Sequence, residues 1–398
     1  MNMSNNSDRT KWRSETKGVH GGTLRSQFDE TSEAIFLNSG FIYSSAEEAE
    51  SAFGDEINRY LYSRFGNPSI SMFEEKLRII EGAESCKATG SGMSAVFAAL
   101  ASYLNVGDRL VASKALFGSC YIICKEILPK FGIEISFVDG TNLEEWEKAL
   151  SKPTKAIFLE TPSNPSLEII DISKISQLAK VSNAKVFVDN VFSTPILQKP
   201  IDLGADVVIY SATKHIDGQG RCLGGAILSS EEFIEDIVTP FIRHTGPCLS
   251  PFNAWVLLKG LETLSLRIKE HSRNALEIAN YLQTKKIVSK TIYPSLSSHP
   301  QNDIAIKQMN AGGGVVSFEI NGNKENVFKF LNKLQIIRIS NNLGDAKSLI
   351  CHPSTTTHQR LSDDEKFEAG ITQNLIRLSV GLENINDLID DLEYALDS

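Results

Sequence analysis

Short apolar runs alternate with amphipathic stretches through the middle of the chain, from about residue 66 to residue 258. Runs rich in Val, Ile, Leu and Phe predict strands at 109–111, 134–138, 155–159, 185–188, 206–209 and 225–228. Hydrophobic residues at helical spacing predict helices at 94–104, 120–131, 143–150 and 172–181. This alternation predicts an α/β fold with a buried, mostly parallel sheet and right-handed crossovers.

A second pattern follows this region. Helical spacing over 251–281 leads into predicted strands at 315–320 and 335–339 and predicted helices at 325–334 and 386–396. We therefore predict a large domain over 66–258 and a smaller C-terminal α/β domain over 259–398. Residues 1–65 lack a core of their own and form a predicted arm that packs on another surface, beginning with a disordered tail over 1–17.

Reactive side chains follow two neighbouring predicted strands. The run 185–188 ends in Asp189, and the run 206–209 is followed by Ser211, Thr213 and Lys214. Ligands of parallel sheets bind beyond the carboxyl ends of the strands. These residue types suit pyridoxal 5′-phosphate. A lysine can form a Schiff base with its aldehyde, an acid can keep its pyridine nitrogen protonated, and short hydroxyls can bind its phosphate. A solvated surface lysine is the alternative.

Two further segments could bind a phosphate. The small residues at 89–94 open an apolar helix, so its backbone N–H groups could approach an anion, although a plain N-cap has the same pattern. The segment lacks the glycine spacings of dinucleotide sites and P-loops, which disfavours NAD and ATP. Tyr62 and Arg64 precede a turn, where they are either phosphate ligands or a packing tyrosine and an exposed arginine.

Composition narrows the class of protein. Hydrophobic residues make up 41% of the 398 residues and charged residues 22%, as in soluble globular proteins. The formal net charge of −9, without a basic block, argues against nucleic acid as a partner. No apolar run is long enough to span a membrane, and no signal sequence is recognisable. The six cysteines form no C-x-x-C pair, which disfavours a metal site and favours the cytoplasm.

Six short motifs in order resemble the Cys/Met-metabolism family of pyridoxal phosphate enzymes, the cystathionine γ-synthase-like branch of fold type I. They lie at 62–68, 91–95, 160–165, 188–190, 211–214 and 375–383. The resemblance implies a large domain with a mostly parallel, seven-stranded type of sheet, a smaller C-terminal α/β domain and an N-terminal arm. It also implies pyridoxal 5′-phosphate as the cofactor.

The resemblance implies how the cofactor would be held. Lys214 would form the Schiff base and then move protons, and Asp189 would pair with the pyridine nitrogen. Asn164 would contact the ring hydroxyl and the substrate, and Phe117 occupies the position where many members stack a tyrosine. The phosphate would be held by Ser211, Thr213 and the amides of Gly92 and Met93.

The resemblance also implies an active site shared between subunits. Tyr62 and Arg64 would reach the phosphate of the neighbouring subunit, which makes the arm part of that subunit's site and the enzyme a homo-oligomer, a tetramer built as a dimer of dimers. Tyr62 is also a candidate catalytic residue. Arg377 would clamp the substrate α-carboxylate, since its planar fork matches that group, and Asn342 would contact the substrate.

Within the family, Phe117 combined with the run 342–347 resembles the O-succinylhomoserine sulfhydrylases. That group implies γ-replacement, in which an O-acylhomoserine and sulfide give homocysteine. Cystathionine γ-synthase, O-acetylhomoserine sulfhydrylase and the methionine or cystathionine γ-lyases are alternatives within the fold. A non-catalytic cofactor-binding protein is the alternative from another class.

Several polar residues outside these roles stay undecided. His215 is either a base beside Lys214 or a packing residue, and His352 is either a substrate contact or a structural loop residue. Lys347 and Arg360 either recognise the distal carboxylate of a succinyl group or are surface charges. Because the roles of these two residues are open, the sequence does not decide between a succinyl and an acetyl donor.

Overall fold

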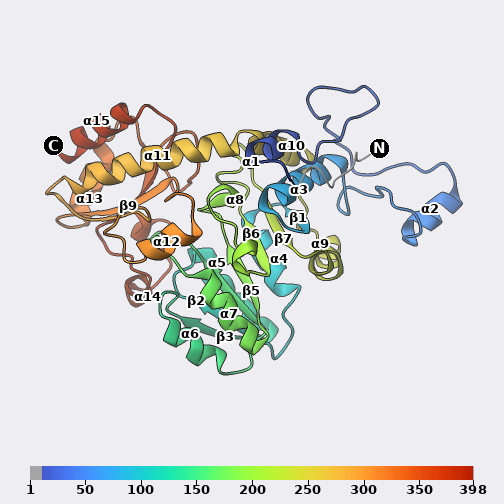
Figure 1. Ribbon diagram of the computed structural model, residues 1–398, viewed down its shortest axis with the longest axis horizontal. Helices are drawn as coiled ribbons and strands as arrows, with labels where there is room; N and C mark the ends of the chain where they lie inside the picture. The colour runs from blue at the N-terminus through green and yellow to red at the C-terminus, as the bar shows by residue number, and fades with distance from the viewer. Residues whose placement is uncertain (1–10, 398) are drawn as a thin grey trace.

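The computed structural model describes residues 11–397, which contain two β-sheets packed with helices (Figure 1). The larger sheet has seven strands in the order β1-β7-β6-β5-β4-β2-β3. Strands β2 to β6 pair in parallel, whereas β7 runs antiparallel to both β1 and β6. The bounds are β1 Ser85–Thr89, β2 Arg109–Ser113, β3 Glu134–Val138, β4 Ala156–Glu160, β5 Lys185–Asp189, β6 Val207–Tyr210 and β7 Gly225–Ser229.

Both faces of the large sheet are covered, because alternate residues of each strand point to opposite sides. Val207 and Ile209 of β6 belong to a core cluster with helix α4, whereas Val208 and Tyr210 pack with α3 and α10 on the other face. The helices of this region are α3 Pro68–Glu81, α4 Gly92–Ala101, α5 Gly118–Ile122, α6 Leu143–Leu150, α7 Ile172–Ser182, α8 Thr194–Leu197, α9 Thr239–Thr245 and α10 Pro251–Glu262.

The smaller sheet has five strands in the order β10-β11-β12-β9-β8. Helix α11, the longest helix, contacts β8 and β9 and runs from the large sheet region to the C-terminal one (Figure 1). The strands are β8 Val288–Ile292, β9 Val315–Ile320, β10 Arg338–Ile339, β11 Leu349–Cys351 and β12 Leu375–Ser379. The helices are α11 Leu264–Gln283, α12 Asn302–Gln308, α13 Lys324–Lys333, α14 Asp363–Glu368 and α15 Ile385–Leu396.

These sheets confirm the predicted fold class, and each predicted strand has a counterpart. Three details differ. The predicted helix 120–131 is an α-helical turn, a π-helix over Ile123–Ile127 and a 3₁₀ turn over Leu128–Phe131, since Pro129 cannot supply a helical N–H. The predicted helix 251–281 breaks at Thr263 into α10 and α11. The predicted strand 335–339 shrinks to β10.

The structure also contains strands that the hydrophobic pattern missed: β1, β8, β11 and β12. Strand β1 has the mixed sequence Ser-Cys-Lys-Ala-Thr and owes its place to antiparallel pairing with β7, a contact between segments about 140 residues apart. The domain boundaries at residues 65/66 and 258/259 remain a prediction. Within residues 11–397, we find no helix with the length and apolar character needed to cross a membrane.

The N-terminal segment has two parts. Helix α1, Ser14–His20, packs against α3, α10 and α11, so the prediction of a disordered tail is wrong for residues 14–17; residues 1–10 lie outside the described part. The chain after α1 contacts the body at Glu33, whose carbonyl oxygen accepts from Nε1 of Trp255 at 2.8 Å, and at Phe36, whose N–H donates to Ser69 at 2.9 Å. It then projects from the body, carries helix α2, Ala46–Phe53, and returns at α3 (Figure 1). The segment between α1 and α3 exposes large apolar side chains, among them Phe28, Leu37 and Ile42.

Candidate active site

A cavity of about 410 Å³ lies where β4, β5 and β6 end and where helix α4 begins. Its size is typical of small-molecule sites. Residues of the C-terminal region, including Arg377 of β12, close one side of it. The predicted site residues that line it are Gly92, Met93, Phe117, Asn164, Asp189, Ser211, Thr213, Lys214 and Arg377. Segments far apart in sequence therefore meet in one chamber.

Asp189 is the last residue of β5 and faces this cavity. Its side chain is 7% exposed, and the N–H of Val191 donates to its Oδ1 at 3.1 Å. Burial raises the pKa of Asp189 to about 7, because a charged carboxylate loses its hydration there. A cationic group of a ligand beside Asp189 would therefore be strongly favoured.

Glu160, a cavity residue that the sequence analysis did not single out, lies beside Asp189. The two residues are register partners at the ends of β4 and β5. Glu160 accepts hydrogen bonds from the N–H groups of Phe117 at 2.7 Å and Asn164 at 2.9 Å. Burial, with the Asp189 carboxylate next, raises its pKa. Glu160 follows the predicted strand 155–159 as Asp189 follows 185–188, and this signal could have found it.

Lys214 lies in the turn after β6, and its side chain points into the cavity region. Its Nζ donates to Oδ1 of Asn342 at 2.6 Å, which brings the predicted substrate residue Asn342 to the lysine. Burial, and then the positive charge of Arg377, lowers the pKa of Lys214 to about 8. The amine is therefore partly neutral near neutral pH, as a nucleophile or a base must be.

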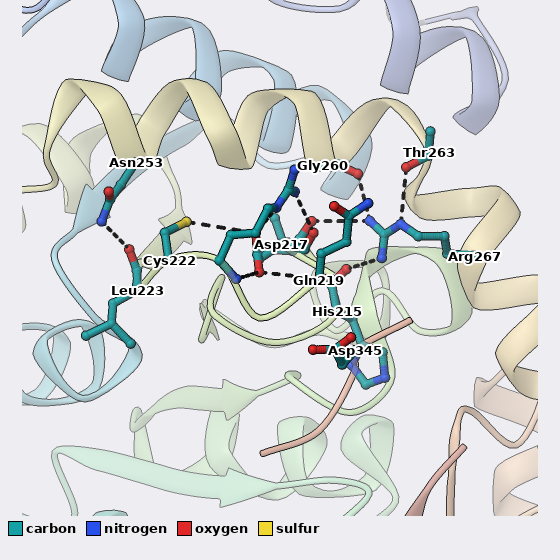
Figure 2. Close-up of polar contacts among 12 residues, drawn as sticks. His215, Asp217, Gln219, Cys222, Leu223, Asn253, Gly260, Thr263, Arg267 and Asp345 are labelled. Atoms are coloured by element: carbon teal, nitrogen blue, oxygen red, sulfur yellow. Dashed lines mark hydrogen bonds and ion pairs between the residues drawn. The ribbon is translucent and has the colours of Figure 1, made fainter. Parts of the chain in front are cut away.

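The backbone after Lys214 is fixed by Arg267 of helix α11 (Figure 2). The Arg267 guanidinium donates to the carbonyl oxygens of His215 at 2.6 Å, Ile216 at 3.2 Å and Gly260 at 2.7 Å. A Cβ on Gly218, where φ is +69°, would lie 2.0 Å from this guanidinium, so the turn requires glycine. Rigid support of this kind keeps the lysine in one position.

His215 points away from the cavity. Its imidazole is 1% exposed, packs edge-to-face on His271 with ring centroids 6.0 Å apart, and has no hydrogen-bond partner at either nitrogen within the described chain. Burial lowers its pKa to about 3, so the ring is neutral. This geometry favours the packing alternative. His352, bonded to Thr355 at 2.8 Å and to the carbonyl of Gln373 at 2.9 Å, is likewise a loop residue.

The beginning of helix α4 forms a cradle suited to a phosphate. Ser91 caps the helix, its Oγ accepting from the N–H of Ser94 at 3.1 Å, and Gly92 follows. A Cβ on Gly92 would lie 2.5 Å from Cβ of Ser211, so only glycine lets the helix and the turn before Lys214 approach this closely. Free N–H groups and the positive end of the helix dipole favour an anion here. The donor set fits a phosphate.

Arg377 is a second anion-binding element. Its side chain is 1% exposed, and it donates to Oδ1 of Asn164 at 3.1 Å and to the carbonyl oxygens of Asn341 at 2.8 Å and Asn342 at 3.1 Å. Its Nε is buried without a hydrogen-bond partner, and the partners of its other nitrogens within residues 11–397 are these uncharged amide and carbonyl oxygens. A buried, unpaired guanidinium facing a cavity is suited to a ligand carboxylate.

Tyr62 and Arg64 do not line this chain's cavity. Tyr62 is 43% exposed, and Arg64 donates to the carbonyl oxygen of Arg243 and lies 4.8 Å from the ring of Phe65. Their predicted role concerns a neighbouring subunit, so the single chain leaves it a prediction.

Comparison with known proteins identifies the family. A sequence model described as "Cys/Met metabolism PLP-dependent enzyme" matches residues 15–397. The chain belongs to this family. An O-succinylhomoserine sulfhydrylase of Mycobacterium tuberculosis is 53% identical over 96% of this chain and 95% of its own. Another, from Pseudomonas aeruginosa, is 42% identical over 96% and 94%. An L-methionine gamma-lyase of Fusobacterium nucleatum is 39% identical over 96% and 97%.

Comparison with solved structures gives the same family. A putative O-acetylhomoserine (thiol)-lyase of Campylobacter jejuni has a TM-score of 0.93 at 34% identity, covering 97% of this chain and all of that one, and carries N′-pyridoxyl-lysine-5′-monophosphate. A cystathionine gamma synthase of Xanthomonas oryzae has a TM-score of 0.93 at 32% identity, covering 97% and 98%. The Cys/Met-metabolism enzyme described here therefore has the fold type I architecture and pyridoxal phosphate as its cofactor, as the motifs predicted.

The pKa of Lys214 predicts how fast this Cys/Met-metabolism enzyme takes up its cofactor. Only the neutral amine attacks an aldehyde. In the cofactor-free enzyme, the rate of covalent attachment of pyridoxal phosphate should rise ~10-fold per pH unit below a midpoint of about 8 and level off above it. Stopped-flow absorbance from pH 6.5 to 9.5 measures this rate. Binding of pyridoxine phosphate, which lacks the aldehyde, is the control; a rate still climbing at pH 9.5 would contradict the lowered pKa.

Proposed function

We propose that this enzyme converts O-succinylhomoserine and sulfide to homocysteine and succinate. The observation that carries the proposal is the 53% identity, over nearly the whole of both chains, to an O-succinylhomoserine sulfhydrylase. The cavity supports it, because a lysine, a buried acid, an anion cradle and a buried arginine face one chamber. The reaction exchanges an acyloxy group for a thiol at Cγ, with no net oxidation or reduction.

The cavity residues would hold pyridoxal phosphate in a single orientation. The N–H groups of Gly92 and Met93, with the hydroxyls of Ser211 and Thr213, would hold the phosphate, and Asp189 would pair with the pyridine nitrogen. Phe117 would pack on the ring, held by the bond from its N–H to Glu160. When bound, the cofactor supplies an electron sink that stabilises negative charge on substrate carbons.

Arg377 would fix the substrate. Its unpartnered Nε and its position beside Asn164 suit the α-carboxylate of an amino acid. Holding that carboxylate sets which bond at Cα is aligned for cleavage, an effect of orientation rather than of acid–base chemistry. The hydrogen bonds from Arg377 to two loop carbonyls keep the guanidinium in place as substrate enters.

Lys214 would carry the protons of the reaction. Its neutral amine takes a proton from Cα of the substrate and returns one later, for which a pKa near the working pH is favourable. Phe117 has no proton to give or accept, so the aromatic residue at this position takes no part in proton transfer. Tyr62 of a neighbouring subunit remains the second proposed catalytic group.

We further propose that the enzyme works as a homo-oligomer, a tetramer in the arrangement that the resemblance implies. The segment between α1 and α3 exposes Phe28, Leu37 and Ile42, which a neighbouring subunit would cover. The same neighbour would receive Tyr62 and Arg64 at its phosphate site. The cytoplasmic location expected from the cysteine pattern stays a prediction.

The test is an assay of the purified, cofactor-loaded enzyme with O-succinylhomoserine, with and without sulfide, with products identified by mass spectrometry. Homocysteine formed only when sulfide is present supports the proposal. Cystathionine formed from cysteine at a higher rate, or an α-keto acid released without any nucleophile, would instead identify a synthase or a γ-lyase. Light scattering during gel filtration gives the mass of the assembly, and a monomer would contradict the shared site.

A further inference from the structure

A second cavity, of about 530 Å³, adjoins the active-site cavity. Met93, Ser119 and Thr357 line both cavities, so the two spaces meet at these three side chains. The second cavity lies between the segment 118–127 and the loop 356–361. When the substrate Cα lies at Lys214 and the α-carboxylate lies at Arg377, the substrate side chain with its acyl group is free to extend into this second cavity.

The walls of the second cavity are fixed in place. One wall is α5 with the π-helix, which presents Ile122, Ile123 and Ile127; π-helices occur often at functional sites. The opposite loop is anchored beyond its end, where Glu365 accepts hydrogen bonds from the hydroxyl of Tyr121 at 3.1 Å and from Lys125. An apolar wall of this kind suits methylene groups.

One cation lines the second cavity. Arg360 is exposed at its edge, and its guanidinium has no hydrogen bond or ion pair within residues 11–397. His358, also in the lining, is buried, and burial lowers its pKa to about 4, so it is neutral. Two other exposed cations of the described chain are paired, Lys347 with Asp345 at 3.2 Å and Arg221 with Asp217 at 2.9 Å.

We infer that the second cavity binds the acyl group of the substrate, with Arg360 pairing with the terminal carboxylate of a dicarboxylic monoacyl group such as succinyl. This inference rests on the proposed function, and it assigns the choice of acyl donor to one side chain. A guanidinium makes two parallel hydrogen bonds to a carboxylate, whereas an acetyl group offers no charge to it. Lys347 becomes a surface charge in this assignment.

The test compares Arg360→Gln with the wild-type enzyme, both loaded with cofactor, on O-succinylhomoserine and O-acetylhomoserine at saturating sulfide. Loss of a charge-assisted pair predicts a fall of about 10- to 100-fold in kcat/KM for the succinyl substrate. The value for the acetyl substrate should change ~2-fold or less. Arg360→Lys should lie between the two, because it keeps the charge and loses the fork.

An inhibition measurement gives a second readout. Succinate should inhibit the wild-type enzyme, and its inhibition constant should rise by about 10- to 100-fold in Arg360→Gln. Lys347→Gln is the matched control, since it removes another exposed cation near the site, and neither quantity should change more than ~2-fold. Unchanged cofactor absorbance and melting temperature show that each variant is folded.

The outcomes separate this inference from the proposed function. Wild-type enzyme that makes no homocysteine from O-succinylhomoserine overturns the proposed function, and the acyl assignment with it. If the wild type does make homocysteine, equal losses for both substrates in Arg360→Gln would overturn the role of Arg360 alone. A succinyl-selective loss in Lys347→Gln would do the same and would move the recognition to Lys347.

Discussion

Replacing Lys214 with alanine is expected to lower kcat/KM for homocysteine formation at least ~1,000-fold, since one group supplies both covalent attachment and proton transfer. The purified Lys214→Ala protein should also lack the yellow absorbance of lysine-bound pyridoxal phosphate. No other amine can take the place of Lys214, because the cavity lining of the described chain contains no second lysine. Absorbance spectra and steady-state rates measure both effects.

Lys185→Ala is the matched control for that variant. Lys185 begins strand β5 at the opposite edge of the same sheet, where it pairs with Asp206 at 3.3 Å. This partly exposed pair contributes at most ~1 kcal/mol to the free energy of unfolding. Activity and absorbance should therefore match the wild type. A Lys214→Ala enzyme that keeps the yellow band, or retains a tenth of the wild-type rate, would contradict the role of Lys214.

Asp189→Asn is expected to lower kcat/KM by about 100- to 1,000-fold while the protein stays folded and keeps the cofactor attached to Lys214. The amide has nearly the same shape as the carboxylate, but it carries no charge to keep the pyridine nitrogen protonated, so the electron sink weakens. Loss of the buried ion pair should also weaken cofactor affinity ~10-fold or more. Kinetics and equilibrium titration of the cofactor-free protein measure the two effects.

The control for this variant is Asp206→Asn, at the residue before strand β6 and at the far edge of the sheet from the cavity. Asp206 accepts from the N–H of Val186 at 2.8 Å, a bond that an asparagine oxygen can also accept. Catalysis and cofactor affinity should stay within ~2-fold of the wild type. An Asp189→Asn enzyme within 10-fold of the wild-type rate would show that Asp189 does not control the cofactor.

Much of the large sheet and of the site could be predicted from the sequence because each buried parallel strand is recognisable from its own residues. The runs 186–188 and 207–209 are continuously apolar, and they remain strands in the structure as β5 and β6. The chemical residues follow at strand ends, so Asp189 and Lys214 could be singled out before any contact was known. The same rule, applied to the run 155–159, would have found Glu160.

Other features have no local signature. Strand β1 is polar and short, and β10 has two residues, so both depend on the strands beside them. The helical pattern at 251–281 continues through Thr263, but the chain bends there, and Arg267 just beyond the bend reaches back to the turn after Lys214. No periodicity predicts such a contact, because its partners are about 50 residues apart.

The sequence by itself thus determined the fold class, the family, the cofactor and the residues that meet at the strand ends, since each depends on short motifs and on patterns within one element. Only the tertiary structure decided the rest. It placed Asn342 on Lys214, buried Glu160 beside Asp189, turned His215 away from the cavity and joined the cavity to a second space at Arg360. These arrangements depend on packing between distant elements, whose energies no local pattern contains.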